Sequence, residues 1–360
     1  GLGEPELLEE IIASGSADMV SVARGLIAEP FLPEKMAFGH PEDVRPCIRC
    51  NYCFSHNYIP LTPYPKRLPR CAVNPVFGRE DQFRQAQCST HLPRRRVVIA
   101  GGGPAGMQAA LTAAELGHHV TLYEKSNRLG GLLHIAIRPS FKTDLQNFLQ
   151  YLIGQVEHDR RIDLQLNRAL TPQDVQELNP DLLVIAVGSQ LVVPPIPGCK
   201  LPHVHTLTDL SEQNPDLGRQ IVVIGGGLSG CEEALDLAQH GKQVALLEAD
   251  TQVLLSLGHD DYLHKKDLVD EMEHTQGLTV HCDCSVSEIT DNCVICRNAD
   301  GTPQQYKADS VIIACGTRPL DHVVNELRTA GSKYIVIGDC YQARNLRSAL
   351  QEGFLSVLDI

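Results

Sequence analysis

Four cysteines near the start of the sequence carry its clearest chemical signal. Cys47, Cys50 and Cys53 recur at intervals of three residues in CIRCNYC, and Cys71 follows in RCAVNP. Thiolates at such short spacing bind either zinc or an iron–sulfur cluster. Structural zinc usually takes two separated CxxC pairs, whereas three cysteines that share the middle residue suit three corners of a [4Fe–4S] cube. We therefore predict a [4Fe–4S] cluster on these four residues and keep zinc as the alternative.

The sequence contains 13 cysteines, and those outside this group are predicted to be small core residues. Cys293 and Cys296 form a CxxC, but side chains at i and i+3 of a strand point to opposite faces. Cys282 and Cys284 share one face and are expected to pack there. So many cysteines in a long, intracellular-looking chain favour metal or redox chemistry over a disulfide framework.

Two glycine-rich segments indicate a second kind of chemistry, the binding of dinucleotides. RRVVIAGGGPAGMQAALTAAELGHHVTLYEKS, which starts at Arg95, is repeated as RQIVVIGGGLSGCEEALDLAQHGKQVALLEAD. Gly225 lies 124 positions after Gly101, and Glu248 lies 124 positions after Glu124. Such a fixed register implies two copies of one structural unit. Each copy has G-x-G-x-x-G between a strand and a helix, and an acid at the end of the next strand, which is the full dinucleotide-binding pattern.

Each residue type in this pattern has a physical role. The first glycine permits a tight turn, the second lets a pyrophosphate approach the backbone, and the third lets helix and strand pack closely. The helix N-terminus then offers N–H groups to the phosphates, and the acid accepts hydrogen bonds from ribose hydroxyls. The predicted loop residues are Gly101, Gly103, Ala105 and Gly106 in the first copy and Gly225, Gly227, Leu228, Ser229 and Gly230 in the second.

The second acid also bears on the choice of nicotinamide cofactor. A carboxylate at Glu248 would repel a 2′-phosphate, so NADH is favoured over NADPH unless Lys265 or Lys266 folds over the site. The first copy is followed instead by NRLGG, a second glycine turn ending at Gly131, past which a long dinucleotide such as FAD could run. FAD in the first copy and a nicotinamide in the second is the expected pair.

These motifs need a doubly wound α/β fold with parallel sheets to position them. DLLVIAVGS reads as a buried strand between the copies, and a β-meander with an Asp300–Gly301 turn follows the second copy. YIVIGDC, near the end, reads as one more strand. The simplest arrangement inserts the second Rossmann-like domain into the first, whose final strand then returns at the end of the chain.

Bulk composition excludes several other functions. A net charge of −13 disfavours nucleic acid as a partner, because a phosphate-binding surface needs concentrated Lys and Arg. No apolar run approaches the length of a membrane span, and the acidic start GLGEPELLEE lacks a signal-peptide core. We expect a cytoplasmic protein whose partners are a nicotinamide cofactor and a small molecule.

The ordered series ADMVSVARGLIAEPFLPEKMAFGHPEDVRPCIRCNYC, CAVNPVFGRE and VVIAGGGPAGMQAA resembles the NADH:flavin oxidoreductases of the 2,4-dienoyl-CoA reductase and trimethylamine dehydrogenase group. That group joins an Old Yellow Enzyme-type FMN barrel to a [4Fe–4S] loop and two nucleotide domains. The resemblance implies that NAD(P)H reduces FAD, FAD reduces the cluster, the cluster reduces FMN, and FMN reduces an activated C=C bond of an enoate or enoyl-CoA. No cysteine lies between Glu124 and Lys142, where flavin disulfide reductases carry a redox pair, so the cluster is the expected exit for electrons.

The resemblance also implies roles for single residues. It assigns cluster ligation to the four cysteines, although close relatives of the dienoyl-CoA type have one more residue before the third. Ala23 and Arg24 match the end of the barrel that meets the FMN phosphate. The implied FAD contacts beyond the first loop are Glu124, Gly131, Leu132, Lys142, Leu170 and Asp339.

The resemblance divides the chain into parts. We expect the end of a TIM barrel at 1–42, the iron–sulfur loop and a linker at 43–93, an FAD-binding domain at 94–208 and 308–360, and an NAD(P)H-binding domain at 209–307. A whole (β/α)8 barrel needs about 250 residues, so the substrate and catalytic residues of the family are expected to lie outside this sequence, which we take as the C-terminal part of a longer protein.

Two other interpretations remain. An amine-dehydrogenase-like protein would pass electrons outward to a separate carrier, with the second nucleotide site only structural. A non-enzymatic scaffold would pack its first 40 residues on a partner.

Overall fold

The computed structural model describes residues 3–54, 70–88, 93–255, 257, 262–330 and 333–360. The chain forms two compact units. Unit 1 comprises Gly1–Leu133, Thr143–Ser189 and Pro319–Ile360, and unit 2 comprises His134–Lys142 and Gln190–Arg318. Most of unit 2 therefore lies, in the sequence, between two pieces of unit 1.

A five-stranded parallel sheet forms the centre of unit 1, in the order β15-β4-β1-β2-β3. Its strands are β1 (Arg96–Ala100), β2 (His119–Tyr123), β3 (Ile162–Gln165), β4 (Leu182–Ile185) and β15 (Tyr334–Val336). This is the 3-2-1-4-5 order of a Rossmann half, and it confirms the predicted fold class. The strand predicted in YIVIGDC does return to this sheet, beside β4.

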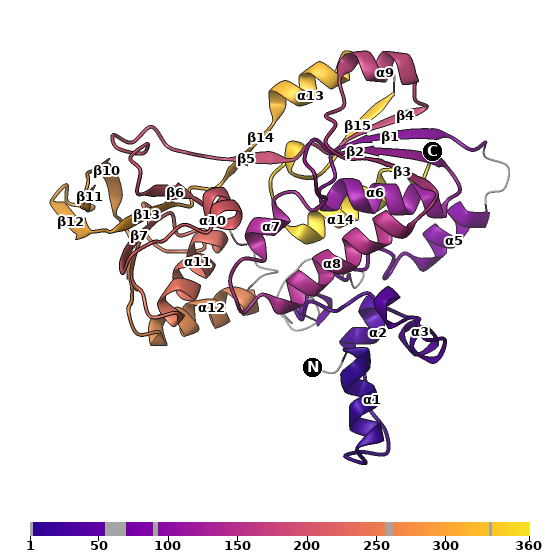
Figure 1. Ribbon diagram of the computed structural model, residues 1–360, viewed down its shortest axis with the longest axis horizontal. Helices are drawn as coiled ribbons and strands as arrows, with labels where there is room; N and C mark the ends of the chain where they lie inside the picture. The colour runs from indigo at the N-terminus through magenta and orange to yellow at the C-terminus, as the bar shows by residue number, and fades with distance from the viewer. Residues whose placement is uncertain (1–2, 55–69, 89–92, 256, 258–261, 331–332) are drawn as a thin grey trace, which may run out of the picture. The chain divides into compact units, whose positions relative to one another are not determined.

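Helices cover both faces of this sheet, as Figure 1 shows. On one face, α6 (Pro104–Glu115) contacts β1, β2 and β4, and packs against α8 (Thr143–His158) and α14 (Leu346–Leu355). On the other face, α9 (Pro172–Leu178) and α13 (Asp321–Arg328) close a core with alternate residues of β1 and β4. Four-residue apolar runs in β1 and β4 are buried throughout, as a doubly covered parallel strand requires.

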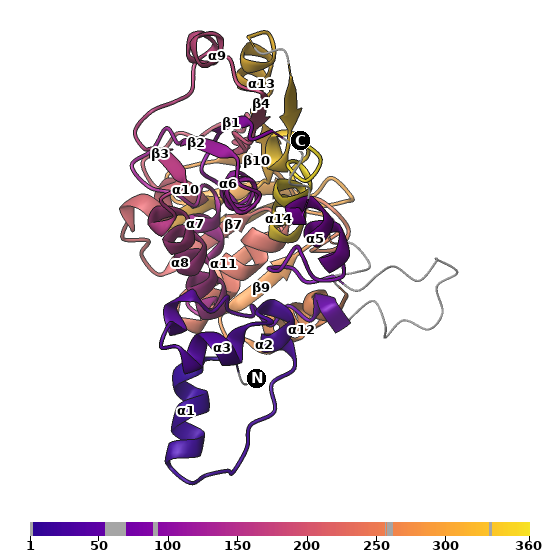
Figure 2. The same cartoon turned by 90° about the vertical axis from the view of Figure 1, so that its right-hand side faces the viewer.

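The start of unit 1 is helical, and Figure 2 shows its first helices grouped together. They are α1 (Pro5–Ala13), α2 (Arg24–Ala28), α3 (Leu32–Ala37) and the 3-10 turn η1 (Pro41–Asp43), and α5 (Glu80–Cys88) follows the cysteine loop. Leu8, Leu32 and Val44 form a small core among them. The 3-10 turn η3 (Gly338–Cys340) follows β15.

Unit 2 has a second five-stranded parallel sheet, in the order β6-β13-β7-β8-β9. Its strands are β6 (Val204–Thr206), β7 (Gln220–Ile224), β8 (Gln243–Leu247), β9 (Leu278–His281) and β13 (Ser310–Ile313). Ile221 and Val223 of β7 face a core with α10 (Leu207–Gln213), α11 (Leu228–Gln239) and α12 (Tyr262–His274). Val222 and Ile224 face the opposite way.

The opposite face of that sheet is covered by an antiparallel meander, as predicted. Its strands are β10 (Ser285–Ile289), β11 (Cys293–Arg297) and β12 (Pro303–Lys307). The short strands β5 (Ser189–Leu191) and β14 (Thr317–Pro319) pair with each other and contain the unit boundaries, and α7 (Leu133–Ala136) contains another.

Two cysteine predictions were wrong. Cys88, expected in the core, is exposed at the end of α5. Cys284 and Cys296, expected to be free core thiols, are joined by a disulfide. The antiparallel register sets Val286 opposite Cys296 and brings the Cα atoms of the two cysteines to 5.8 Å. A β-bulge interrupts that register beyond Val286, and sequence spacing could not reveal which residues would face each other.

Candidate functional site

The first glycine loop has the geometry that a dinucleotide cradle needs. Gly101 has φ +109, and a Cβ there would overlap the carbonyl oxygen of Ala186 at the end of β4. A Cβ on Gly106 would overlap the carbonyl oxygen of Gly101. A Cβ on Gly103 would instead meet no described atom within 4 Å. The first and third glycines are therefore needed for packing, and the second faces open space where a pyrophosphate could approach.

The second loop repeats this geometry in unit 2. Gly225 has φ +110, and its Cβ would overlap the carbonyl oxygen of Ala314 after β13. A Cβ on Gly230 would overlap the carbonyl oxygen of Gly225. A Cβ on Gly227 would meet no atom of the described residues within 4 Å. In each unit the loop lies at the point where the strand order reverses, which is where doubly wound sheets bind ligands.

The helix that follows each loop offers backbone N–H groups of its first turn to a ligand, except that Pro104 at the start of α6 has none. α6 and α11 are both 12 residues long, with Gly103 and Gly227 as N-caps. A glycine at the N-cap has no side chain that could bond to these groups. Free N–H groups and the positive end of the helix dipole favour a phosphate at these positions.

The two predicted ribose acids also brace the loops, a role that the sequence analysis missed. Glu124 is buried, and its carboxylate accepts from the N–H of Gly102 (2.7 Å) and from the N–H and Oγ of Ser126 (2.8 and 2.7 Å). Glu248 likewise accepts from Gly226 and from Asp250. A carboxylate offers about four lone-pair sites, so each retains capacity for a ribose hydroxyl.

The two sites differ just beyond the acid. The N–H of Gly130 donates to the carbonyl of Gly102 at 2.9 Å, and Leu254, 124 positions later, does the same for Gly226 at 2.8 Å. Both residues have positive φ, +116 and +58. The next residue is Gly131 in unit 1, whose Cβ would lie 3.3 Å from the Cα of Gly103, but an exposed leucine in unit 2. The unit 1 site is thus the one with a second glycine turn against its loop.

The remaining predicted FAD contacts lie in varied surroundings. Leu132 is partly buried beside the glycine turn, and Leu170 is part of the core over β1 and β4. Asp339 follows β15 and accepts from the Ser189 hydroxyl at 3.2 Å. It shares the carboxyl edge of the sheet with the first loop and Glu124.

Four thiols lie near one another in unit 1. Cys71 is buried, Cys47 and Cys53 are partly buried, and Cys50 keeps part of its surface exposed. Loss of water around the sulfur raises the pKa of Cys50 to about 11, and the other three thiols add to the shift. Burial also raises the pKa of Cys53 and Cys71. A bound cation would reverse this tendency and hold the sulfurs as thiolates.

The spacing of these thiols distinguishes two kinds of metal centre. Around one zinc ion, Zn–S bonds of ~2.3 Å place the four sulfurs about 3.8 Å apart. A cube binds each sulfur at a different iron, so its sulfurs lie further apart. No three of the four sulfurs lie within 4.8 Å of one another.

The backbone between these cysteines is in an unusual conformation. Arg49 (φ +51) and Asn51 (φ +58) are both left-handed. Their side chains are fixed by charged partners: Arg49 makes a two-point ion pair with Asp144 of α8 at 2.5 and 2.6 Å, and Asn51 accepts from Arg24 at 2.6 Å. Left-handed residues that alternate in this way turn backbone N–H groups toward an enclosed anion, as in many iron–sulfur sites.

Arg24, predicted to bind the FMN phosphate, therefore already has a protein partner. With Ala23 it lines a pocket of about 220 Å³ that also includes Cys47, Arg49 and Asp144. This pocket connects the predicted phosphate end of a barrel with the cysteine loop.

Residues 95–345 match the family model described as pyridine nucleotide-disulphide oxidoreductase. The chain belongs to this family. It is a flavin-dependent oxidoreductase that binds FAD and NAD(H).

Its relatives confirm the resemblance seen in the sequence. NADH oxidase of Thermoanaerobacter brockii is 34% identical over 359 residues, which are 98% of this chain and 53% of the relative. Cinnamate reductase of Clostridium sporogenes is 30% identical over 354 residues, 98% of this chain and 51% of the relative. A solved complex of 2-naphthoyl-CoA reductase with 2-naphthoyl-CoA superposes with a TM-score of 0.86 at 29% identity, and covers 99% of this chain and 53% of that one. The chain spans about half the length of the curated relatives it matches.

The oxidoreductase also has a buried acidic group in unit 2 that the sequence analysis missed. Glu232, Glu233 and Asp236 of α11 are 4%, 2% and 7% exposed. Burial raises the pKa of Glu233 to about 7, although the guanidinium of Arg138 opposes the shift. Lys142, predicted to contact FAD, is ion-paired with Glu232, so binding a pyrophosphate would require it to leave that partner. The signal in the sequence was the run CEEALD, which places three acidic residues among the apolar residues of one helix.

The two lysines considered for NADPH are also occupied in unit 2. Lys265 donates to the backbone carbonyl of Leu254 at 3.2 Å, and Lys266 pairs with Asp270. Neither of these two interactions involves Glu248. This arrangement suits NADH better than NADPH.

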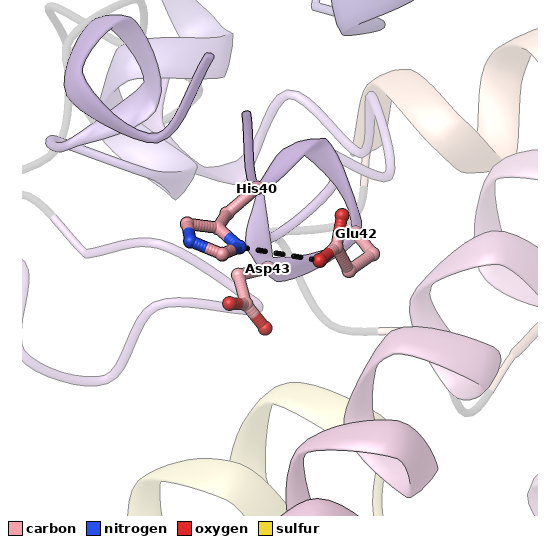
Figure 3. Close-up of side chains that lie close together, drawn as sticks. All are labelled: His40, Glu42 and Asp43. Atoms are coloured by element: carbon pink, nitrogen blue, oxygen red, sulfur yellow. Dashed lines mark hydrogen bonds and ion pairs between the residues drawn. The ribbon is translucent and has the colours of Figure 1, made fainter. Parts of the chain in front are cut away.

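One further group of side chains could approach a cation. His40, Glu42 and Asp43 form the one cluster of three ligand atoms within 4.8 Å in the described part of the oxidoreductase (Figure 3). His40 and Glu42 contact each other at 3.4 Å and are exposed, while Asp43 accepts from Gln155. These surface contacts account for the group without a metal.

None of the helices formed by the described residues has the length and apolarity needed to span a membrane.

Proposed function

We propose that this chain is the electron-input part of an NADH-dependent iron–sulfur flavin oxidoreductase that reduces an activated C=C bond. The substrate would be an enoate or a 2,4-dienoyl-CoA-like thioester. NADH would bind in unit 2, FAD in unit 1, and a [4Fe–4S] cluster on Cys47, Cys50, Cys53 and Cys71. FMN would lie in a barrel of which residues 1–42 are the end.

One observation carries this proposal: unit 1 combines a dinucleotide cradle with a four-thiol loop fixed to the same fold. The loop is tied to α8 through Arg49 and Asp144. Its thiols are spaced more widely than one zinc ion requires, and its backbone has the alternation that suits an anionic cluster. In addition, one guanidinium nitrogen of Arg70, next to Cys71, is buried without a hydrogen-bond partner in the described residues. A sulfur-rich anion would satisfy that donor.

The residues of the chain would bind the two dinucleotides, orient their riboses and select NADH over NADPH. FAD and the cluster, when bound, supply the conversion of a two-electron hydride into single electrons. The open positions at Gly103 and Gly227 would admit the two pyrophosphates, and Glu124 and Glu248 would orient the riboses. Glu248 would also select against a 2′-phosphate.

The proposed substrate rests on the relatives and on the surface of the first 40 residues. Cinnamate reductase and 2-naphthoyl-CoA reductase are named for conjugated acids and thioesters. Met19, Phe31 and Phe38 are 85%, 59% and 77% exposed, more than large apolar side chains usually are. A barrel packed on this segment would cover them.

The test begins with material purified without oxygen and assayed for FAD, iron and sulfide. NADH oxidation is then measured with ferricyanide, a one-electron acceptor, and with a quinone, a two-electron acceptor. We expect about one FAD and four irons per chain, and oxidation of NADH with both acceptors. The matched control is Cys71→Ser, which should lose iron and keep FAD and quinone-linked activity.

Two results would contradict the proposal. A failure of FAD-loaded protein to oxidise NADH would contradict the proposed role in electron input. Zinc found in place of iron would contradict the proposed cluster. In the full-length protein, oxidation of an amine without reduction of cinnamate-like acids would favour the amine-dehydrogenase alternative, in which electrons run outward.

A further inference from the structure

Three side chains of the cysteine loop are held by three different elements of unit 1. Arg49 is held by α8 and Asn51 by the first residue of α2, as described above. Tyr52, between Cys50 and Cys53, is held by Arg347 of α14, whose guanidinium carbon lies 3.5 Å from the centre of the tyrosine ring. The other cation–π pairs of the described residues have separations of 5.1–5.9 Å. The contact between Arg347 and Tyr52 is therefore unusually close.

Tyr52 also acts directly on a sulfur. Its backbone N–H donates a hydrogen bond to the Cys50 sulfur. Because the ring and the N–H belong to one residue, the contact with Arg347 restricts the position of the residue whose N–H donates to the sulfur. Hydrogen bonds to ligand sulfurs and nearby charge both set the reduction potential of an iron–sulfur cluster.

Arg347 is itself on a rigid support. It is the second residue of α14, and this helix is capped by Asn345, whose side chain accepts from the N–H of Ser348 at 3.0 Å. Leu350 and Phe354 of the same helix are buried, at 0% and 1% exposed. α14 packs closely on α6, the helix of the first nucleotide loop. The guanidinium therefore has a fixed position relative to the flavin-binding fold of unit 1.

We propose that Arg347 is a positioning residue of the cysteine loop that raises the reduction potential of the cluster. It would do so by holding the Tyr52 N–H on the Cys50 sulfur and by placing a permanent positive charge beside the loop. This inference rests on the proposed function, because it requires a cluster on these cysteines. Reduction adds one electron and one negative charge, so a fixed cation and a sulfur-directed N–H both favour the reduced form.

The experiment is a dithionite titration of iron-loaded protein, with the reduced cluster followed by electron paramagnetic resonance. In Arg347→Gln we expect the equilibrium constant for one-electron reduction to fall three- to tenfold, a lowering of about 30–60 mV. Arg347→Lys keeps the charge but not the planar stack and should show a smaller shift. Arg328→Gln is the matched control, because Arg328 stacks on Tyr334 at 5.2 Å elsewhere in unit 1. It should leave the potential unchanged.

A second variant separates positioning from charge alone. Tyr52→Leu removes the aromatic face, and Arg347→Gln in that background should then shift the potential by less than it does in the wild type. Equal shifts in both backgrounds would overturn the positioning role. So would an unchanged potential in iron-loaded Arg347→Gln, or a loss of iron with no change in the potential of the remainder. Wild-type protein without iron would overturn the proposed cluster and this inference together.

Discussion

Replacing Gly227 by alanine tests the most specific geometric feature of the nucleotide sites. The backbone there has φ −70 and ψ 178, which alanine adopts without strain. A Cβ at this position would meet no described atom within 4 Å. The substitution therefore adds one methyl group to a space that is open in the protein and that we assign to the pyrophosphate of NAD(H).

The expected cost falls on binding, not on folding. Alanine loses a little as an N-cap and gains a little by restricting the unfolded chain, so stability should change by about 1 kcal/mol or less. A pyrophosphate held off the loop would lose about two charge-assisted hydrogen bonds, together about 3 kcal/mol. That loss corresponds to a roughly 100-fold higher Kd.

The assay is calorimetric titration with NAD⁺, which binds without reducing the flavin, alongside thermal denaturation. Two glycines in the same unit provide controls. Gly230→Ala should lower stability as well as affinity, because its Cβ would overlap the carbonyl oxygen of Gly225 and overpacking costs about 1–3 kcal/mol. Gly241→Ala, at φ +83 in open space, should cost about 1–2 kcal/mol of stability with no loss of affinity.

The comparison of the three variants can refute the reasoning. Wild-type affinity in Gly227→Ala would mean that the open space is not where the pyrophosphate lies. A large loss of stability in that variant would mean that the space is filled in the folded protein. Weak binding in Gly241→Ala would mean that affinity follows stability in general.

Three further predictions concern single side chains. Cys50→Ser should lose most of its iron with FAD retained, because a hydroxyl is a poor ligand for iron; retained iron measured against flavin absorbance would exclude Cys50 as a ligand. Glu248→Gln keeps an acceptor for Gly226 but removes the charge, so the NADH preference over NADPH in steady-state rates should fall about tenfold, ~1.4 kcal/mol; an unchanged ratio would place selectivity elsewhere. The raised pKa of Glu233, about 7 against 4.5 when unfolded, means that the native state binds the extra proton, so stability should decline by up to about 3 kcal/mol as the pH rises from 4.5 through 7. Urea denaturation of Glu233→Gln should show no such decline, and an identical pH profile would show that another group is responsible.

The fold followed from the sequence because its signals are local and repeated. The glycine loops fix where a strand must end and a helix begin, and Gly117 and Gly241 follow the ends of the helices with φ +84 and +83. The apolar runs of β1 and β4 are short and buried throughout, which is typical of a parallel sheet covered on both faces. These features depend on residues close in sequence, and a single chain shows them directly.

The site was only partly predictable, because its finer contacts join residues far apart in the sequence. The bond from Arg24 to Asn51, the ion pair of Arg49 with Asp144 and the disulfide from Cys284 to Cys296 all depend on which elements fold together. None has a local signature. The position of Glu124 was predicted, but its hydrogen bond to Gly102 required the distance between two loop backbones to be known.

The repeat places one structural pattern at two sites, which we expect to bind different dinucleotides. Over 124 positions of offset, the two loops keep the same turns, the same open glycine and the same bracing acid. They diverge at Gly130 and Gly131, where unit 2 has Leu254 and Leu255, so the second glycine turn against the loop is a feature of unit 1. If that glycine gives passage to the longer flavin dinucleotide, then a side chain there should impair FAD retention while the equivalent position in unit 2 tolerates change. A Cβ on Gly131 would lie 3.3 Å from the Cα of Gly103, and a substitution there makes the proposed FAD site in unit 1 open to measurement.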